Sequence, residues 1–106
     1  MANKDYSVEI YPMAFADLDG IYAYYYTESQ EQSVAEKVIG ELKSAILGLS
    51  FMPKSHPLVK ERRLRSDGFR KLICGNYVIP FLIDEDKKLV SVVRVFSGKM
   101  NYQKYL

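Results

Sequence analysis

Three strand-like runs in the last third of the chain constrain the fold more than any other feature. They cover residues 70–74, 77–83 and 89–97. Residues 75–76, Gly-Asn, form a tight hairpin signal because both residue types tolerate the positive φ angles that match strand twist. Residues 84–88 form a second polar turn. The sequence therefore predicts an antiparallel meander that carries polar side chains.

The residues that precede the meander follow the helical period. Apolar side chains at steps of three and four share one face of a helix, and this spacing holds for Phe15, Leu18, Tyr22 and Tyr25. It predicts a first helix over residues 13–27, with Gly20 as a weak point that costs about 1 kcal/mol relative to alanine.

A second helix is indicated from Ser33, which forms a capping-box pattern with Glu36. Behind it runs an apolar stripe of Ala35, Val38, Ile39, Leu42, Ala45, Ile46 and Leu49. Residues 28–32 suit a connection between antiparallel helices, so both stripes are expected to face the same sheet. A loop follows from residue 51.

A short strand is predicted over residues 6–11, where Val8 and Ile10 share one face. Pro80 conflicts with a central strand because proline lacks the ladder N–H, so a local distortion is expected there. The predicted order is β-α-α-β-β-β. The fold class is α+β, with a helical hairpin packed on a small, largely antiparallel sheet, in one domain over residues 1–106.

Composition excludes several classes of protein. The chain has 106 residues, 48% of them hydrophobic and 26% charged, which is typical of a globular domain. Cys74 is the only cysteine, which excludes an internal disulfide and a multi-cysteine zinc site. No metal or organic cofactor is indicated. With no long apolar run and no signal-like start, a cytoplasmic location is expected.

The element order and four local patterns carry a family resemblance. The patterns are residues 68–72 (Gly-Phe-Arg-Lys-Leu), 76–79 (Asn-Tyr-Val-Ile), 83–84 (Ile-Asp) and 92–96 (Val-Val-Arg-Val-Phe). In this order the chain resembles the RelE/ParE superfamily of bacterial toxins from type II toxin-antitoxin modules. The resemblance covers nearly the whole chain. It implies a growth inhibitor, of the kind linked to plasmid stabilization, that a cognate antitoxin neutralises.

The resemblance leaves the target open between two branches. RelE-like members cut messenger RNA on the ribosome, whereas ParE-like members inhibit DNA gyrase without a nuclease site. The basic pair of the usual ParE-like ending is reduced here to Lys99, within residues 96–101. The net charge of only +2 and the lack of an evident base favour gyrase inhibition. The alternatives are an mRNA endonuclease and a degenerate member that only binds antitoxin.

The nuclease alternative assigns roles to four residues. Cleavage through the 2′-hydroxyl requires cations around the phosphate and a proton source for the leaving oxygen, and the candidates are Arg70, Arg94, Lys99 and Tyr102. Each arginine is equally compatible with a structural role. Tyr102, like Tyr105, would more ordinarily pack on the sheet.

The proton acceptor is the weakest part of that alternative. His56 is the only histidine and lies between Ser55 and Pro57, where an exposed loop histidine is the ordinary interpretation. Cys74 is better explained as a small hydrophobic strand residue than as a nucleophile.

Two further clusters point to partners. Residues 60–71 form a basic segment that suits nucleic acid, an acidic partner or plain solvation; its cations are Lys60, Arg62, Arg63, Arg65, Arg70 and Lys71. Four tyrosines in residues 22–26 exceed what one buried helix face can hold. Some of those rings should therefore lie at the surface, where tyrosine favours protein contacts.

Overall fold

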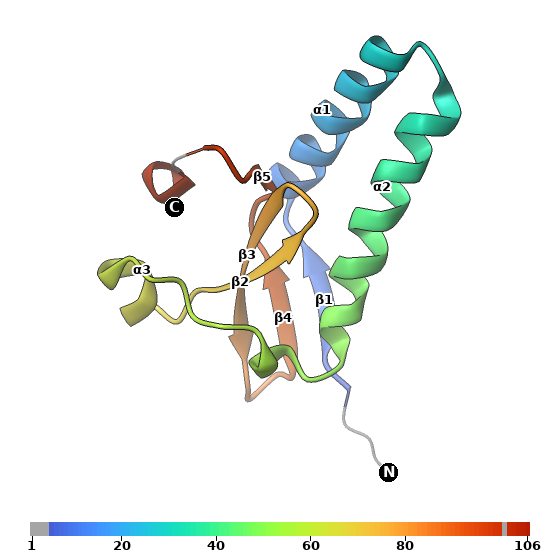
Figure 1. The fold of residues 1–106 in the computed structure, drawn as a ribbon. Coiled ribbons are helices and arrows are strands. Elements are labelled where there is room, and N and C mark those ends of the chain that lie inside the picture. The colour runs from blue at the N-terminus through green and yellow to red at the C-terminus, as the bar shows by residue number, and fades with distance from the viewer. Residues whose placement is uncertain (1–4, 101) are drawn as a thin grey trace.

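A helical hairpin covers one face of a five-stranded mixed sheet in the computed structural model, which describes residues 5–100 and 102–106 (Figure 1). The predicted α+β class is confirmed. The predictions that involve the first four residues, and residue Asn101 of the family-like ending, lie outside the described residues. Among the residues described, none of the helices is both long enough and apolar enough to span a bilayer.

The first helix is longer than predicted, the second ends before Leu49 of its predicted stripe, and their connection is shorter. Helix α1 covers Pro12–Ser29 and helix α2 covers Gln32–Leu47. Gln30 adopts a left-handed conformation with φ of 59°, and its N–H donates to the carbonyl of Tyr26. This arrangement ends α1 and turns the chain within two residues.

The predicted capping box at Ser33 is wrong. Ser33 lies inside the first turn of α2, and Glu31, at the capping position, makes no side-chain cap hydrogen bond. Instead the side-chain amide of Gln32 donates to Glu36 at 2.7 Å, one turn further along. A pair at this spacing stabilises the first turn directly, so the helix begins one residue before the predicted cap.

The apolar stripe of α2 packs on the sheet as predicted, but that of α1 is rotated. Ala14 and Leu18 are buried on α1, whereas Phe15 is 48% exposed. Successive residues of a helix point in directions that differ by about 100° around the helix axis. The buried line of α1 therefore passes through Ala14, Leu18 and Ile21, which pack in the core between the helices and the sheet.

The strands run in the order β1-β4-β3-β2, and β5 also pairs with β3. Their bounds are β1 Ser7–Ile10, β2 Arg70–Cys74, β3 Tyr77–Asp84, β4 Leu89–Val92 and β5 Phe96–Ser97. β1 lies parallel to β4, and the other pairs are antiparallel. The helical hairpin supplies the long connection that a parallel arrangement requires.

Pro80 marks a bulge in the sheet. Val78 pairs with Phe96 and Phe81 pairs with Val92, so two residues of β3 face three of the partner strand. The N–H of Val93 donates to the carbonyl of Pro80 at 3.2 Å. The distortion expected at Pro80 is confirmed, whereas the predicted single strand over residues 89–97 is wrong: it divides into β4 and β5, because an extra residue interrupts the ladder.

A second, smaller core lies on the sheet face opposite the helical hairpin. It consists of Val59, Leu64, Val78, Phe96 and Tyr102, with Phe69 and Leu106 packed against them. Besides the sheet itself, the short helix α3 (Arg62–Ser66) and the C-terminal 3-10 helix η3 (Tyr102–Tyr105) supply residues to it. Two further 3-10 turns, η1 (Gly48–Ser50) and η2 (Pro53–Ser55), lead from α2 toward α3.

Candidate functional site

A groove of about 1000 Å³ lies between α1, the tip of the β2–β3 hairpin and the segment that follows β5. We call it the central groove. Its apolar and aromatic lining comes mainly from Ile21, Tyr24, Tyr25, Ile73, Tyr77, Val78, Val95 and Met100. Asp17 and Lys99 add opposite charges to the same lining. Concave surfaces with a few charged groups are the usual sites of molecular recognition.

Three tyrosines stand together in this groove. The rings of Tyr24 and Tyr25 meet edge to face with centroids 5.1 Å apart. The hydroxyl of Tyr77 donates to that of Tyr25 at 3.4 Å, which links the hairpin to α1. Burial and the contact with Tyr25 raise the pKa of Tyr77 well above its usual value, so its hydroxyl stays protonated. Tyr24 remains 58% exposed and available to a partner, in line with the predicted surface tyrosines.

Arg94 is held by a carboxylate at the edge of the groove. Its Nε donates to Oδ2 of Asp17 at 2.7 Å and its second guanidinium nitrogen donates to Oδ1 at 3.0 Å. The main-chain N–H of Val95 donates to the same Oδ2 at 2.8 Å. These hydrogen bonds raise the pKa of Arg94 further above its usual value. The pair is partly buried and fixes α1 against the interruption between β4 and β5.

Phe96 connects Arg94 with the C-terminal tyrosines. The Cζ of Arg94 lies 4.6 Å from the centre of the Phe96 ring, a cation–π distance. Tyr102 stacks on Phe96 with centroids 6.0 Å apart, and Tyr105 approaches at 5.8 Å. Tyr102 is only 9% exposed, and burial raises its pKa. Arg94 and Tyr102 are thus brought together through a shared aromatic neighbour.

Arg70 lies in β2 and holds the preceding loop. One guanidinium nitrogen donates to the carbonyl of His56 at 2.6 Å and to that of Lys54 at 3.2 Å. The His56 ring is partly buried and meets Phe81 edge to face, with centroids 6.0 Å apart. Both side chains are therefore engaged in contacts that shape the loop.

Lys99 is the candidate that lies in the central groove itself. It is exposed, and within the described part of the chain its ammonium forms no ion pair. Cys74 is partly buried in β2, with its sulfur 4.0 Å from the carbonyl oxygen of Glu41 on α2. This placement agrees with a small packing residue.

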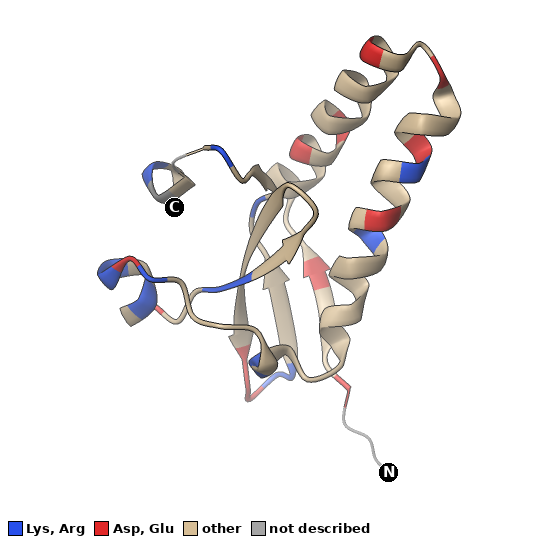
Figure 2. Ribbon diagram, viewed as in Figure 1, with Lys and Arg blue, Asp and Glu red and all other residues tan. Residues whose placement is uncertain are grey.

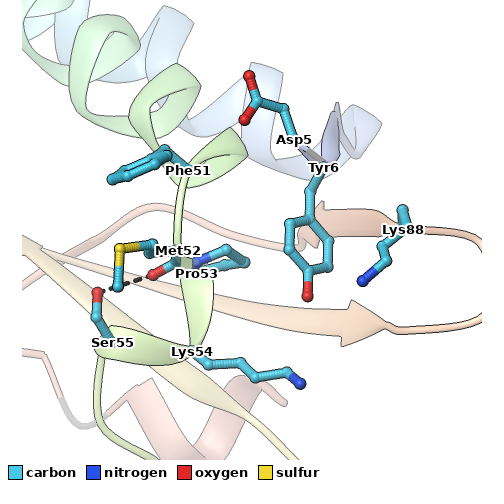
Figure 3. Close-up of a pocket in the computed structure, with 8 residues that line it drawn as sticks. All are labelled: Asp5, Tyr6, Phe51, Met52, Pro53, Lys54, Ser55 and Lys88. Carbon is cyan, nitrogen blue, oxygen red and sulfur yellow. Dashed lines mark hydrogen bonds between the residues drawn. The ribbon is translucent and has the colours of Figure 1, made fainter. Parts of the chain in front are cut away.

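A second concave surface of about 670 Å³ lies beside the start of β1 (Figure 3). Tyr6, Phe51 and Met52 give it an apolar lining, and Lys54 and Lys88 stand at its side. Phe51 is 67% exposed and Met52 is 60% exposed. Met52 has a positive φ of 49°, and its carbonyl accepts a hydrogen bond from the Ser55 hydroxyl at 2.8 Å.

Glu85 joins the polar groups of this surface. Its carboxylate accepts a hydrogen bond of 2.8 Å from the Tyr6 hydroxyl and forms ion pairs with Lys54 at 2.7 Å and with Lys88 at 3.3 Å. The hydrogen bonds from Lys54 and Tyr6 lower the pKa of Glu85 to about 2. The ammonium of Lys88 also lies 4.8 Å from the centre of the Tyr6 ring.

The sequence matches the model of one protein family over residues 8–102. That family is described as the ParE toxin of the type II toxin-antitoxin system, parDE. The chain belongs to the ParE toxin family. The match spans both long helices and every strand except Ser7 at the start of β1, and it includes the central groove, Arg70 and Arg94.

Solved structures agree on the fold. A chain of the chromosomal ParDE toxin-antitoxin system from P. aeruginosa superposes with a TM-score of 0.76 at 19% identity, covering 92% of this chain and all of that one. A chain of the RelBE2 toxin-antitoxin complex from Mycobacterium tuberculosis superposes with a TM-score of 0.67 at 20% identity, covering 91% of this chain and 94% of that one. No curated protein matches the sequence. The fold is therefore shared with chains of both toxin-antitoxin systems.

Several residues that shape these surfaces could not be predicted from the sequence. Asp17 is a single carboxylate on a helix, and nothing in its local pattern pairs it with a residue 77 positions away. For Tyr77 the sequence predicted only a place at the start of a strand. Glu85 lies in a turn whose charges looked like ordinary solvated groups, so neither local spacing nor composition singled it out.

Proposed function

We propose that this member of the ParE toxin family stops bacterial growth by inhibiting DNA gyrase and does not cut RNA. Gyrase would be met in the cytoplasm, in line with the location expected from the sequence. The family match supports a toxin, and the choice of target rests on the arginines.

The engagement of Arg94 by Asp17 is the observation that carries this choice. A nuclease needs guanidinium groups that are free to approach a phosphate and to neutralise its developing charge. Here two guanidinium N–H groups of Arg94 are taken by one carboxylate, at 2.7 and 3.0 Å. Presenting Arg94 to a phosphate would require breaking a partly buried ion pair, which is unfavourable.

Arg70 and Tyr102 support the same choice. Arg70 donates to two loop carbonyls, and Tyr102 lies in the second core, where its raised pKa makes it a poor proton donor at neutral pH. Lys99 in the central groove is left as a contact residue for the target protein. The exposed apolar side chains around it, Tyr24, Ile73 and Met100, suit such an interface.

A supercoiling assay tests the proposal. Purified toxin should inhibit supercoiling by gyrase or trap cleaved DNA, and Lys99→Glu should weaken that inhibition at least tenfold without lowering the melting temperature. Lys37→Glu on α2 is the matched control, since Lys37 is exposed and does not line the groove. Full gyrase activity at saturating wild-type toxin would contradict the proposal.

The RelE-like nuclease remains the second candidate, and the proximity of Arg94 to Tyr102 around Phe96 favours it. Under this alternative Arg70→Ala or Arg94→Ala abolishes cleavage of ribosome-bound message while the protein stays folded. Asp17→Asn separates the two functions further, because it keeps the arginine and releases its guanidinium. A nuclease should retain or gain cleavage in this variant.

We further propose that a cognate antitoxin covers the exposed apolar side chains. The large ones on the helices and on the segment after α2 are Met13, Phe15, Tyr24, Tyr26, Leu47, Phe51 and Met52. An extended or helical antitoxin segment would bury them on binding. The small protein encoded beside this gene should co-purify with the chain and restore growth. Failure of both tests for every neighbouring small protein would remove this part of the proposal.

A further inference from the structure

The short helix α3 carries a cluster of cations that the proposed function does not use. Lys60, Arg62, Arg63 and Arg65 are all exposed and fall within six residues of sequence. We call these four side chains the basic lobe. Figure 2 shows the Lys and Arg residues of α3, in blue, on the side of the sheet away from the helical hairpin.

The lobe stands on an ordered base. Leu64 and Val59 are fully buried in the second core. The Glu61 side chain accepts a hydrogen bond of 2.8 Å from the main-chain N–H of Leu64. The chain leaves the helix through Gly68, whose φ of 92° suits glycine. The cations are therefore held in place rather than carried on an unstructured loop.

Most of this positive charge is available to a partner. Among the described residues, the cations of the basic lobe form no salt bridge. Within that part of the chain Arg63 alone has an acceptor, a main-chain oxygen of Leu106 at 3.1 Å. Glu61 is occupied by its capping contact, which leaves Asp67 as the other nearby carboxylate. Arg62 and Arg65 lie three residues apart, the spacing of neighbours on one helix face.

The chemistry of the lobe indicates a phosphodiester backbone. Protein interfaces have an apolar or aromatic centre, but the stretch of sequence between Lys54 and Lys71, which carries the lobe, contains none of the exposed large hydrophobic side chains of the described chain. Single-stranded nucleic acid is held largely by stacking on exposed aromatic rings. Tyr105, whose neighbour Leu106 contacts Arg63, is exposed, but its ring already lies against Phe96. Ordered, exposed arginines suit the phosphates of a duplex.

We propose that the basic lobe binds the backbone of double-stranded DNA without sequence preference. The choice of DNA rests on the proposed function, because a gyrase inhibitor meets its target on a duplex. The lobe and the central groove lie on different elements, so the groove can contact gyrase while the lobe contacts DNA.

The test measures binding of the full chain to a labelled 20-base-pair duplex of random sequence at several salt concentrations, without gyrase. Each lost phosphate contact lowers the slope of log K against log salt by about 1. Arg62→Gln/Arg65→Gln should therefore lower the slope by about 2 and weaken binding at low salt about tenfold. Lys37→Gln/Lys43→Gln on α2 removes the same charge and should leave both values unchanged. Circular dichroism confirms that each variant is folded.

Three outcomes would overturn the inference. They are equal effects of the two double variants, equal competition by a polyglutamate peptide, and tighter binding of single-stranded RNA of the same length. Because gyrase is absent, a failure here is distinct from a failure of the supercoiling assay.

Discussion

Asp17 on α1 accepts two hydrogen bonds from Arg94 and a third from the main chain of Val95, so one carboxylate fixes the helix to the bulged region of the sheet. The two side chains are 17% and 18% exposed, which limits screening by water. The pair thus joins the helical hairpin to the strands that border the central groove.

Asp17→Asn should lower the free energy of unfolding by about 2 kcal/mol, because it leaves a partly buried guanidinium without its counter-ion. Urea denaturation measures the change. Asp19→Asn, on the same helix and exposed, is the control and should have little effect. Equal stability of the wild type and Asp17→Asn would show that the pair is not a structural link.

Glu85 makes stability depend on acid pH. Its pKa is about 2 in the folded protein against an ordinary value of 4.5, so the folded state binds fewer protons. The stability from Glu85 is therefore complete above about pH 4.5 and is lost as the pH falls toward 2. Glu85→Gln should remove that part of the acid dependence in urea midpoints taken from pH 6 to pH 2, whereas Asp86→Asn should retain it. Parallel curves for Glu85→Gln and the wild type would contradict the prediction.

Tyr102 should act through packing. Tyr102→Phe keeps the stacked ring against Phe96 and should leave both stability and growth arrest unchanged. Tyr102→Ala empties part of the second core and should lower the free energy of unfolding by about 3 kcal/mol. Melting temperatures and growth curves for both variants give the answer. Loss of growth arrest in a stable Tyr102→Phe protein would instead assign a chemical role to the hydroxyl.

Alanine substitution at two glycines should change the stability of the fold in opposite directions. At Gly98 an added Cβ would lie 3.0 Å from the carbonyl oxygen of Asn76, whose hydrogen bond from Gly98 is 2.6 Å long. Gly98→Ala should therefore push β5 from the hairpin and destabilise the fold by about 1–3 kcal/mol. At Gly20 the added Cβ meets open space, so Gly20→Ala should stabilise α1 by about 0.5–1 kcal/mol. Thermal unfolding measures the stability of both variants. A change of the same sign in the two variants would contradict the prediction.

Local patterns predicted the elements that depend on local physics. The stripe of α2, the Gly-Asn hairpin and the distortion at Pro80 each follow from neighbouring residues, and the structure confirms them. The rotation of α1 at Phe15 escaped prediction because it depends on which face the sheet and α2 both contact. Helix α3 is too short for its period to be visible in the sequence.

The site was less predictable than the fold. Two of the four candidates are engaged by groups that lie far away in the chain: Asp17 binds Arg94, and the carbonyls of the preceding loop bind Arg70. Such pairings arise only when the sheet and the helices assemble. Sequence alone therefore supplied the residues and left their engagement unknown.

The most direct measurement is induced expression of the chain alone in a bacterial host, with new 5′ ends mapped in total RNA while growth and the DNA-damage response are followed. Gyrase inhibition predicts growth arrest with a DNA-damage response and intact messages. Growth arrest with new cuts inside translated messages would contradict this account and establish a ribosome-dependent nuclease, and unchanged growth would indicate a member that only binds antitoxin.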